Sequence, residues 1–168
     1  ITGARSAVGN LAGITVEACS APGIISGSEN WEFVDLPGIY NLHAQTEDGR
    51  VTEDALINPG GKWNPNVILL IADKSTLQGQ VFLALQIREL EIPCILLLNR
   101  MNYETVDPQL CGILEKGLGI PVREIQALKD DPADWVNMLS PLLHQPTVCS
   151  ILRKVPESIE ESLKTLNA

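Results

Sequence analysis

The hydrophobic residues of the chain fall into short apolar runs that alternate with longer stretches of helical periodicity. Four runs have the character of β-strands, and they are Trp31–Val34, Val67–Ala72, Cys94–Leu98 and Val122–Ile125. The middle two contain Val, Ile and Leu without polar alternation, which is typical of strands buried on both faces of a sheet. A weaker pair, Thr15–Ala18 and Gly23–Ile25 with Pro-Gly between them, suggests an edge hairpin.

Helical patterns separate these runs. Apolar side chains recur at three- and four-residue spacing in Thr76–Leu90, Pro108–Leu118 and Pro132–Leu143, and Ser158–Leu166 begins a further helix. Gly119 follows the second of these helices as a stop signal. The stretch Asp48–Trp63 mixes charge, Gly and Pro, and we expect a mobile connection there.

Strands that alternate with helices imply parallel pairing through right-handed crossovers. The sequence therefore predicts an α/β fold with a doubly wound, mostly parallel sheet. Ligands bind such sheets at the carboxyl ends of the strands. Polar residues gather at these ends, in Asp35–Gly38, Ala72–Asp73, Asn99–Asn102 and Gln126–Lys129.

Composition narrows the classes of function. The 168 residues fit one domain, and 45% of them are hydrophobic, which is enough for a core. The formal net charge of −9 argues against binding of nucleic acid or of anionic lipid by charge. Four separate cysteines predict a reducing compartment without disulfides, and the two histidines have no metal-ligand spacing. Because residue 1 is Ile rather than Met, we expect a longer protein.

Two motifs suggest a metal-bound phosphate. In Asp35-Leu36-Pro37-Gly38, a carboxylate at a strand end can hold the water shell of Mg²⁺, and Gly38 leaves its N–H free to approach a terminal phosphate. Alone, this motif is more typical of an ordinary strand-to-turn junction. In Gly13-Ile14-Thr15-Val16-Glu17, the hydroxyl of Thr15 can complete the Mg²⁺ shell, although a β-branched residue that opens a strand is the simpler interpretation.

Two further segments suggest recognition of a base. The buried strand that ends in Asn99-Arg100-Met101-Asn102 predicts that Asn99 braces neighbouring loops and that Asn102 faces a base edge, and a polar turn explains the same residues about as well. Backbone N–H groups of Ala127-Leu128-Lys129 can reach a base carbonyl. The order of all four motifs along the chain, each at a strand end or loop, is that of a Ras-like GTP-binding domain.

The chain resembles the cytosolic G domain of the bacterial ferrous iron transport protein B family, FeoB, over residues 1–143. The stretches that carry the resemblance are Thr2–Arg5, VGNLAGITVE (8–17), VDLPGIYNL (34–42), TEDALI (52–57) and LALQIRELEIPCILLLN (83–99). The resemblance implies a partial G domain of the Ras-like P-loop GTPase fold in residues 1–146 and the start of a helical segment in residues 147–168. It also implies GTP or GDP with Mg²⁺, a cytoplasmic position at the inner face of the membrane, and a membrane-spanning iron-transport domain as partner.

The resemblance assigns roles by position. Gly13–Glu17 matches the first switch, with Thr15 sensing Mg²⁺ and phosphate, and Asp35–Gly38 matches the second switch, with Asp35 holding the metal's water. Asn99–Asn102 matches the guanine-reading loop, and Ala127–Lys129 matches the last base-contacting loop. The family's Gly-x-x-x-x-Gly-Lys-Ser/Thr loop has no counterpart, so we expect the chain to lack the first strand and the phosphate loop, and to be unstable and inactive alone.

The chain also departs from the family at single positions. Asn102 stands where the family has Asp, and an amide meets the two N–H groups of a guanine edge with only one acceptor. We expect this mismatch to cost about 1–3 kcal/mol and to favour xanthine, whose extra carbonyl suits an amide N–H. Arg100 replaces a usual Met, and Ala127 a frequent Ser. These departures keep two alternatives open, which are a degenerate G domain that serves as an interaction module and a generic α/β domain without a nucleotide.

Overall fold

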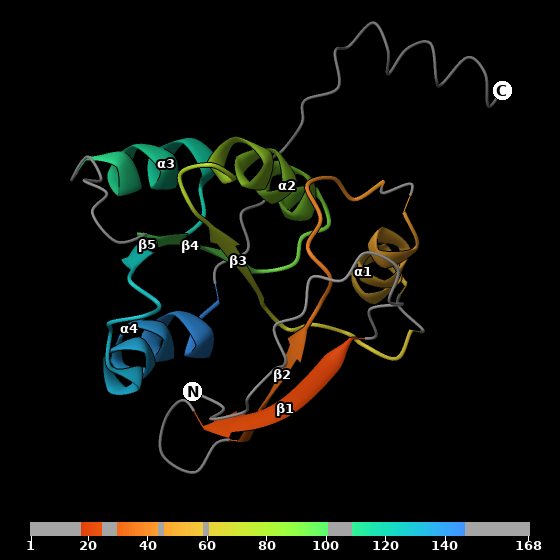
Figure 1. Ribbon diagram of the computed structural model, residues 1–168, viewed down its shortest axis with the longest axis horizontal. Helices are drawn as coiled ribbons and strands as arrows, with labels where there is room; N and C mark the ends of the chain where they lie inside the picture. The colour runs from red at the N-terminus through yellow and green to blue at the C-terminus, as the bar shows by residue number, and fades with distance from the viewer. Residues whose placement is uncertain (1–17, 25–29, 44–45, 59–60, 101–108, 147–168) are drawn as a thin grey trace, which may run out of the picture.

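The computed structural model describes residues 18–24, 30–43, 46–58, 61–100 and 109–146 (Figure 1). Its elements are β1 (Cys19–Ile24), β2 (Asn30–Asp35), α1 (Glu47–Ile57), β3 (Ile68–Ala72), α2 (Leu77–Glu89), β4 (Cys94–Asn99), α3 (Leu110–Leu118), β5 (Val122–Ile125) and α4 (Pro132–His144). The predicted strand start at Thr15 and the predicted helix Ser158–Leu166 lie outside the described residues.

The described strands form two sheets. β3, β4 and β5 pair in parallel in that order, with Leu70 opposite Leu96 and Leu97 opposite Arg123. β1 and β2 form a separate antiparallel pair. The predicted α/β class and the parallel pairing of the three later strands are therefore confirmed, and within the described ranges no strand joins β2 to β3.

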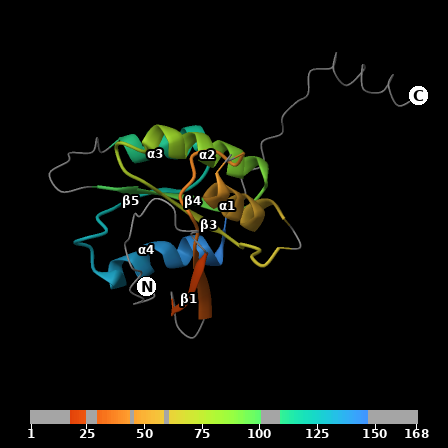
Figure 2. The same cartoon turned by 45° about the vertical axis from the view of Figure 1, so that its right-hand side comes forward.

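Helices cover both faces of the parallel sheet. α2 and α3 lie on one face and α4 lies on the other, in both views of the molecule (Figures 1 and 2). Because alternate residues of a strand face opposite sides of a sheet, β4 supplies both layers: Leu96 packs into the cluster on the α2 and α3 side, and Leu97 packs into the cluster around Leu139 of α4. Both leucines have no exposed surface, as predicted for a strand buried on two faces.

Burial on both faces was also predicted for β3, and there the prediction is wrong in part. Ile71 is 56% exposed, although Leu70 and Ala72 are buried. β3 is the outermost strand of the three-stranded sheet, so one of its sides has no neighbouring strand in the described part of the chain. An apolar run alone does not distinguish a central strand from an outer one.

The prediction of an edge hairpin with a Pro-Gly turn is also wrong. Pro22 and Gly23 do not form a turn, because β1 runs through both of them and pairs with β2, with Cys19 opposite Asp35 and Ile24 opposite Asn30. Proline is tolerated in a strand whose N–H groups need not all enter a ladder. β1 is an outer strand of a two-stranded sheet, so the N–H groups on one of its sides enter no ladder in the described part of the chain.

The expected mobile connection at Asp48–Trp63 is a helix over most of its length. Thr46 caps α1 by accepting the Gly49 N–H at 3.2 Å, a typical N-cap bond. The helix buries Gly49, Thr52 and Ala55, which lie three residues apart on one face. None of the three is a large apolar residue, so hydrophobic periodicity gives no signal for this helix.

Candidate functional site

The loops after β4 and β5 are joined by a side chain. Asn99 ends β4, and its Oδ1 accepts a hydrogen bond from the Ala127 N–H at 3.0 Å. The Arg100 N–H donates to the Ile125 carbonyl at 2.8 Å, which continues the pairing of the two strands by one step. The hydrogen bond to Ala127 is the contact that the predicted bracing role of Asn99 requires. Met101 and Asn102, the other residues of this motif, lie outside the described residues.

Arg100 adds a second link between the same strand ends. Its Nε lies 3.1 Å from Oε1 of Glu124, and its Nη2 lies 3.5 Å from Oε1 of Gln126. The side chains of Arg100 and Glu124 are 42% and 35% exposed, so solvent screens most of this attraction. Arg100, which replaces the Met that is usual in the family, therefore extends toward Glu124 of β5.

In the segment Ala127–Lys129, which was predicted to contact a base, two of the three backbone N–H groups already form hydrogen bonds within the protein. The Ala127 N–H is held by Asn99, and the Lys129 N–H donates to the Gln126 carbonyl at 2.8 Å. Among the residues that the structure describes, none accepts the N–H of Leu128, and this residue is 81% exposed. The sequence predicts that this segment offers N–H groups to a base, and the geometry narrows that prediction to Leu128.

Asp35 ends β2 with an exposed side chain. No described residue forms an ion pair or a hydrogen bond with its carboxylate. Mg²⁺ is bound by one or two protein carboxylates together with water and phosphate oxygens, so a strand-end carboxylate without a partner in the described part of the chain fits this ion. Thr15, the predicted partner of Asp35 at the metal, lies outside the described residues.

The loop that follows Asp35 lies between two helices. From α1, the Thr52 hydroxyl donates to the Pro37 carbonyl at 2.8 Å. From α2, the Gln80 amide donates to the Ile39 carbonyl at 3.4 Å. Tyr40 packs against Gly79 so closely that a Cβ there would lie 2.6 Å from its ring. Gly79 is in the first turn of α2, which follows β3 directly, so this loop also lies near the carboxyl edge of the parallel sheet.

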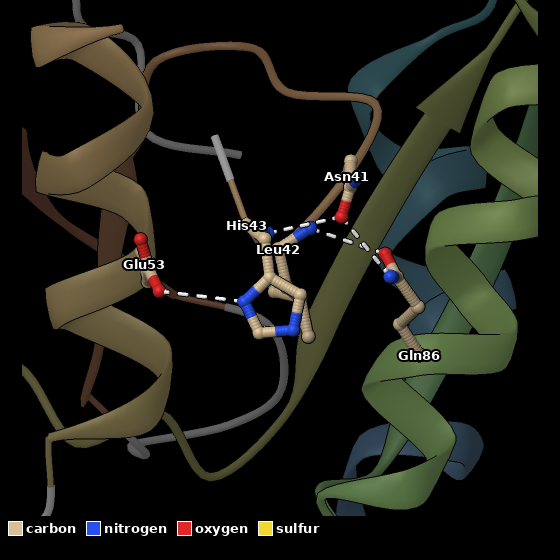
Figure 3. A network of polar contacts seen from close by, with 5 residues as sticks. All are labelled: Asn41, Leu42, His43, Glu53 and Gln86. Carbon is tan, nitrogen blue, oxygen red and sulfur yellow. Dashed lines mark hydrogen bonds and ion pairs between the residues drawn. The ribbon is translucent and has the colours of Figure 1, made fainter. Parts of the chain in front are cut away.

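Gln86 of α2 holds the end of the same loop (Figure 3). Its Oε1 accepts the Leu42 N–H at 3.1 Å, and its Nε2 donates to Oδ1 of Asn41 at 3.0 Å. On the other side of the loop, Nδ1 of His43 lies 3.8 Å from Oε1 of Glu53 on α1. Sequence reasoning missed these contacts, although the polar Gln86 beside the buried Ile87 is a signal that could have indicated a loop contact.

The polar end of β3 has a local structural role. Asp73 Oδ1 accepts the Ser75 hydroxyl at 2.7 Å and the backbone N–H groups of Ser75 and Thr76 at 2.8 and 2.9 Å. These bonds, the Ser75 hydroxyl first, stabilise the ionised form and lower the pKa of the Asp73 carboxyl. Asp73 therefore shapes the turn from which α2 begins.

None of the helices in the described ranges is long and apolar enough to cross a membrane. Within the same ranges, no three His, Cys, Asp or Glu side chains gather in a way that could hold a metal ion.

Comparison with protein families and curated proteins gives one consistent relationship. A family model described as ferrous iron transport protein B matches residues 1–138. The chain is 36% identical over 129 residues to the Fe(2+) transporter FeoB of Synechocystis sp., covering 76% of this chain and 20% of that protein. It is 30% identical over 178 residues to the Fe(2+) transporter FeoB of Escherichia coli K12, covering 95% of this chain and 22% of that protein. The chain thus spans about a fifth of these relatives.

Solved structures show the same similarity. The cytosolic domain of L. pneumophila FeoB superimposes with a TM-score of 0.71 at 26% identity, covering 99% of this chain and 71% of that one. The cytosolic domain of the T. maritima FeoB iron transporter in its apo form superimposes with a TM-score of 0.67 at 23% identity, covering 94% of this chain and 61% of that one. The second likeness bears on the fold alone.

Proposed function

The chain belongs to the ferrous iron transport protein B family, and from this premise we propose that it binds GTP and GDP with Mg²⁺ and hydrolyses GTP slowly. In the intact protein, the nucleotide state is coupled to Fe²⁺ uptake through a membrane-spanning domain. The domain acts at the cytoplasmic face of the bacterial membrane. We place its end at residue 146, with residues 147–168 as the start of a helical segment.

One observation carries the proposal. The hydrogen bond from the Ala127 N–H to Asn99 Oδ1 joins two loops at the carboxyl edge of a parallel sheet, where such folds bind ligands. It leaves the exposed Leu128 N–H as a donor for a base carbonyl. Asn102 is proposed to face the base edge from the neighbouring loop.

The phosphate side of the site is built from the loop after β2. Mg²⁺, when bound, neutralises charge that develops on the transferred phosphoryl group. Asp35 holds the water shell of this ion, Thr15 completes it, and the Gly38 N–H senses the terminal phosphate. None of these residues is an obvious general base, so the proposed hydrolysis depends on orientation and backbone contacts.

Asp35→Ala, introduced into a version of the protein that carries a phosphate-binding loop, tests the proposal. We expect Mg²⁺-dependent GTP hydrolysis to be lost. Glu32→Ala is the matched control, because Glu32 is another exposed carboxylate on β2 and has no proposed contact with the nucleotide. Hydrolysis that survives Asp35→Ala unchanged would contradict the role of Asp35.

A second candidate function is a degenerate G domain that acts as an interaction module. Asn102, Arg100 and the unusual insert at residues 58–63 favour it. Binding isotherms of the same protein with GTP, GDP and XTP separate the two candidates. Binding of none of these nucleotides would favour the interaction module.

A further inference from the structure

Thr52 is a buried polar residue that contacts the loop after β2. It lies on α1, its side chain is only 4% exposed, and its hydroxyl donates to the Pro37 carbonyl at 2.8 Å. The acceptor belongs to the Asp35–Gly38 loop, fifteen residues earlier in the chain. A buried hydroxyl thus fixes one peptide group of the proposed phosphate-sensing loop.

The fixed peptide group is the one that carries the Gly38 N–H. The Pro37 carbonyl and the Gly38 N–H belong to the same planar trans peptide, so they point in opposite directions. Because Thr52 draws the carbonyl toward α1, the N–H is directed away from α1. Among the residues that the structure describes, none accepts this N–H, and a Cβ added at Gly38 would meet no heavy atom of these residues, its two chain neighbours apart, within 4 Å.

The next part of the loop is held from the opposite side. Gln80 and Gln86 of α2 bond the Ile39 carbonyl and the Leu42 N–H. Tyr40 of the loop packs on Gly79 of the same helix. These three contacts anchor the loop beyond Gly38 without the participation of α1. Rotation of the Pro37–Gly38 peptide would break the Thr52 bond while these contacts remained.

We propose that Thr52 is a positioning residue that orients the Gly38 N–H toward the terminal phosphate and thereby raises the preference of the site for a nucleoside triphosphate over a diphosphate. The inference rests on the proposed function. A diphosphate has no acceptor at the terminal position, so an oriented N–H contributes to binding of the triphosphate alone. Pre-orientation also removes the need to order this peptide during binding.

Equilibrium affinities of a nonhydrolysable GTP analogue and of GDP test the inference in the full-length protein that carries this chain. Thr52→Val removes the hydroxyl and keeps the branched shape, and Thr52→Ser keeps the hydroxyl. Thr46→Val is the matched control, because Thr46 is the N-cap of the same helix and its hydroxyl accepts the Gly49 N–H rather than bonding the Asp35–Gly38 loop. We expect Thr46→Val to reduce the stability of α1 by about as much as Thr52→Val does.

We expect Thr52→Val to lower the ratio of triphosphate to diphosphate affinity by about two- to tenfold, the range of one hydrogen bond. Thr52→Ser and Thr46→Val should keep the wild-type ratio. An unchanged ratio in Thr52→Val, or an equal change in Thr46→Val, would overturn the inference and leave the proposed function intact. A wild-type protein that binds neither nucleotide would overturn both.

Discussion

Asn99 and Ala127 lie twenty-eight residues apart in the chain, and the amide oxygen of the first accepts the backbone N–H of the second at 3.0 Å. This bond connects the ends of two neighbouring parallel strands, β4 and β5. One side chain therefore sets the separation of the two loops that are proposed to enclose a base. The bond is the contact that the predicted bracing role of Asn99 requires.

Asn99→Ala should weaken binding of GTP and GDP by the same factor, about tenfold, because both nucleotides carry the same base. Isothermal titration with each nucleotide measures this factor. Arg100→Met is the control: it removes the exposed ion pair to Glu124 between the same strand ends, and such pairs contribute about 0–1 kcal/mol. An Asn99→Ala protein that loses affinity for GTP alone would contradict the bracing role.

How far the sequence predicts this structure depends on which signal each element carries. The strands of the parallel sheet and the helices α2, α3 and α4 follow from apolar runs, helical periodicity and the stop at Gly119, whose φ of 68° shows the left-handed conformation that glycine tolerates. α1 gives no such signal, because its buried face consists of Gly49, Thr52 and Ala55. Its position depends on contacts with a distant loop.

The contacts of the candidate site also differ in how far the sequence predicts them. The contact that Asn99 makes could be predicted, because a polar residue at the end of a buried strand needs a partner at the sheet edge. The contact of Thr52 could not, since its acceptor is the backbone carbonyl of residue 37, and any residue type supplies such a group. Gln86, a polar residue beside the buried Ile87, indicates a contact, but its backbone partner at residue 42 carries no sequence signal. Likewise, the sequence could not show that Asn99 already holds the Ala127 N–H, nor that no described residue accepts the Leu128 N–H.

Glu91→Gly should stabilise the protein. Glu91 follows the end of α2 with a φ of 59°, a left-handed conformation in which a Cβ is unfavourable by roughly 1–2 kcal/mol. Glycine adopts it without that strain, so we expect a gain of about 1 kcal/mol and a rise of about 3 °C in the thermal midpoint. Glu91→Ala removes the same charge but keeps the Cβ, and its midpoint should not rise. Equal midpoints for the Gly and Ala variants would contradict the explanation by strain.

Cys94 should make the stability of the fold fall at high pH. Burial in β4 raises the pKa of its thiol from 9.0 to about 12. Above pH 9 the unfolded chain loses this proton and the folded chain keeps it, so the stability that the neutral thiol contributes is complete below pH 9 and declines between pH 9 and 12. The expected slope is about 1.4 kcal/mol per pH unit.

Urea unfolding of the wild type and of Cys94→Ala, compared at several values from pH 7 to pH 10.5, isolates this thiol, because all other titrating groups are shared. The wild type should be more stable at pH 7, where the alanine leaves a small cavity. Its advantage should shrink above pH 9. Two stability curves that stay parallel over this range would show that the Cys94 thiol does not titrate differently in the folded chain.

Asn102→Asp should change the base that the protein prefers. Asn102 lies outside the described residues, and the prediction rests on its place in the Asn99–Asn102 motif. A carboxylate accepts both N–H groups of the guanine edge, whereas an amide accepts one and presents its own N–H to the other. We therefore expect Asn102→Asp to raise GDP affinity by about ten- to a hundredfold and to lower XDP affinity, because the extra xanthine carbonyl then meets a carboxylate.

Asn102→Ala is the control for this change, because it removes the amide without adding a second acceptor. It should weaken binding of XDP and leave GDP no tighter than in the wild type. Titration of the wild type and of both variants with both diphosphates gives the six affinities that decide the question. If Asn102→Asp left the ratio of GDP to XDP affinity unchanged, residue 102 would not face the base edge, and the bracing by Asn99 would be the only link between this motif and the base.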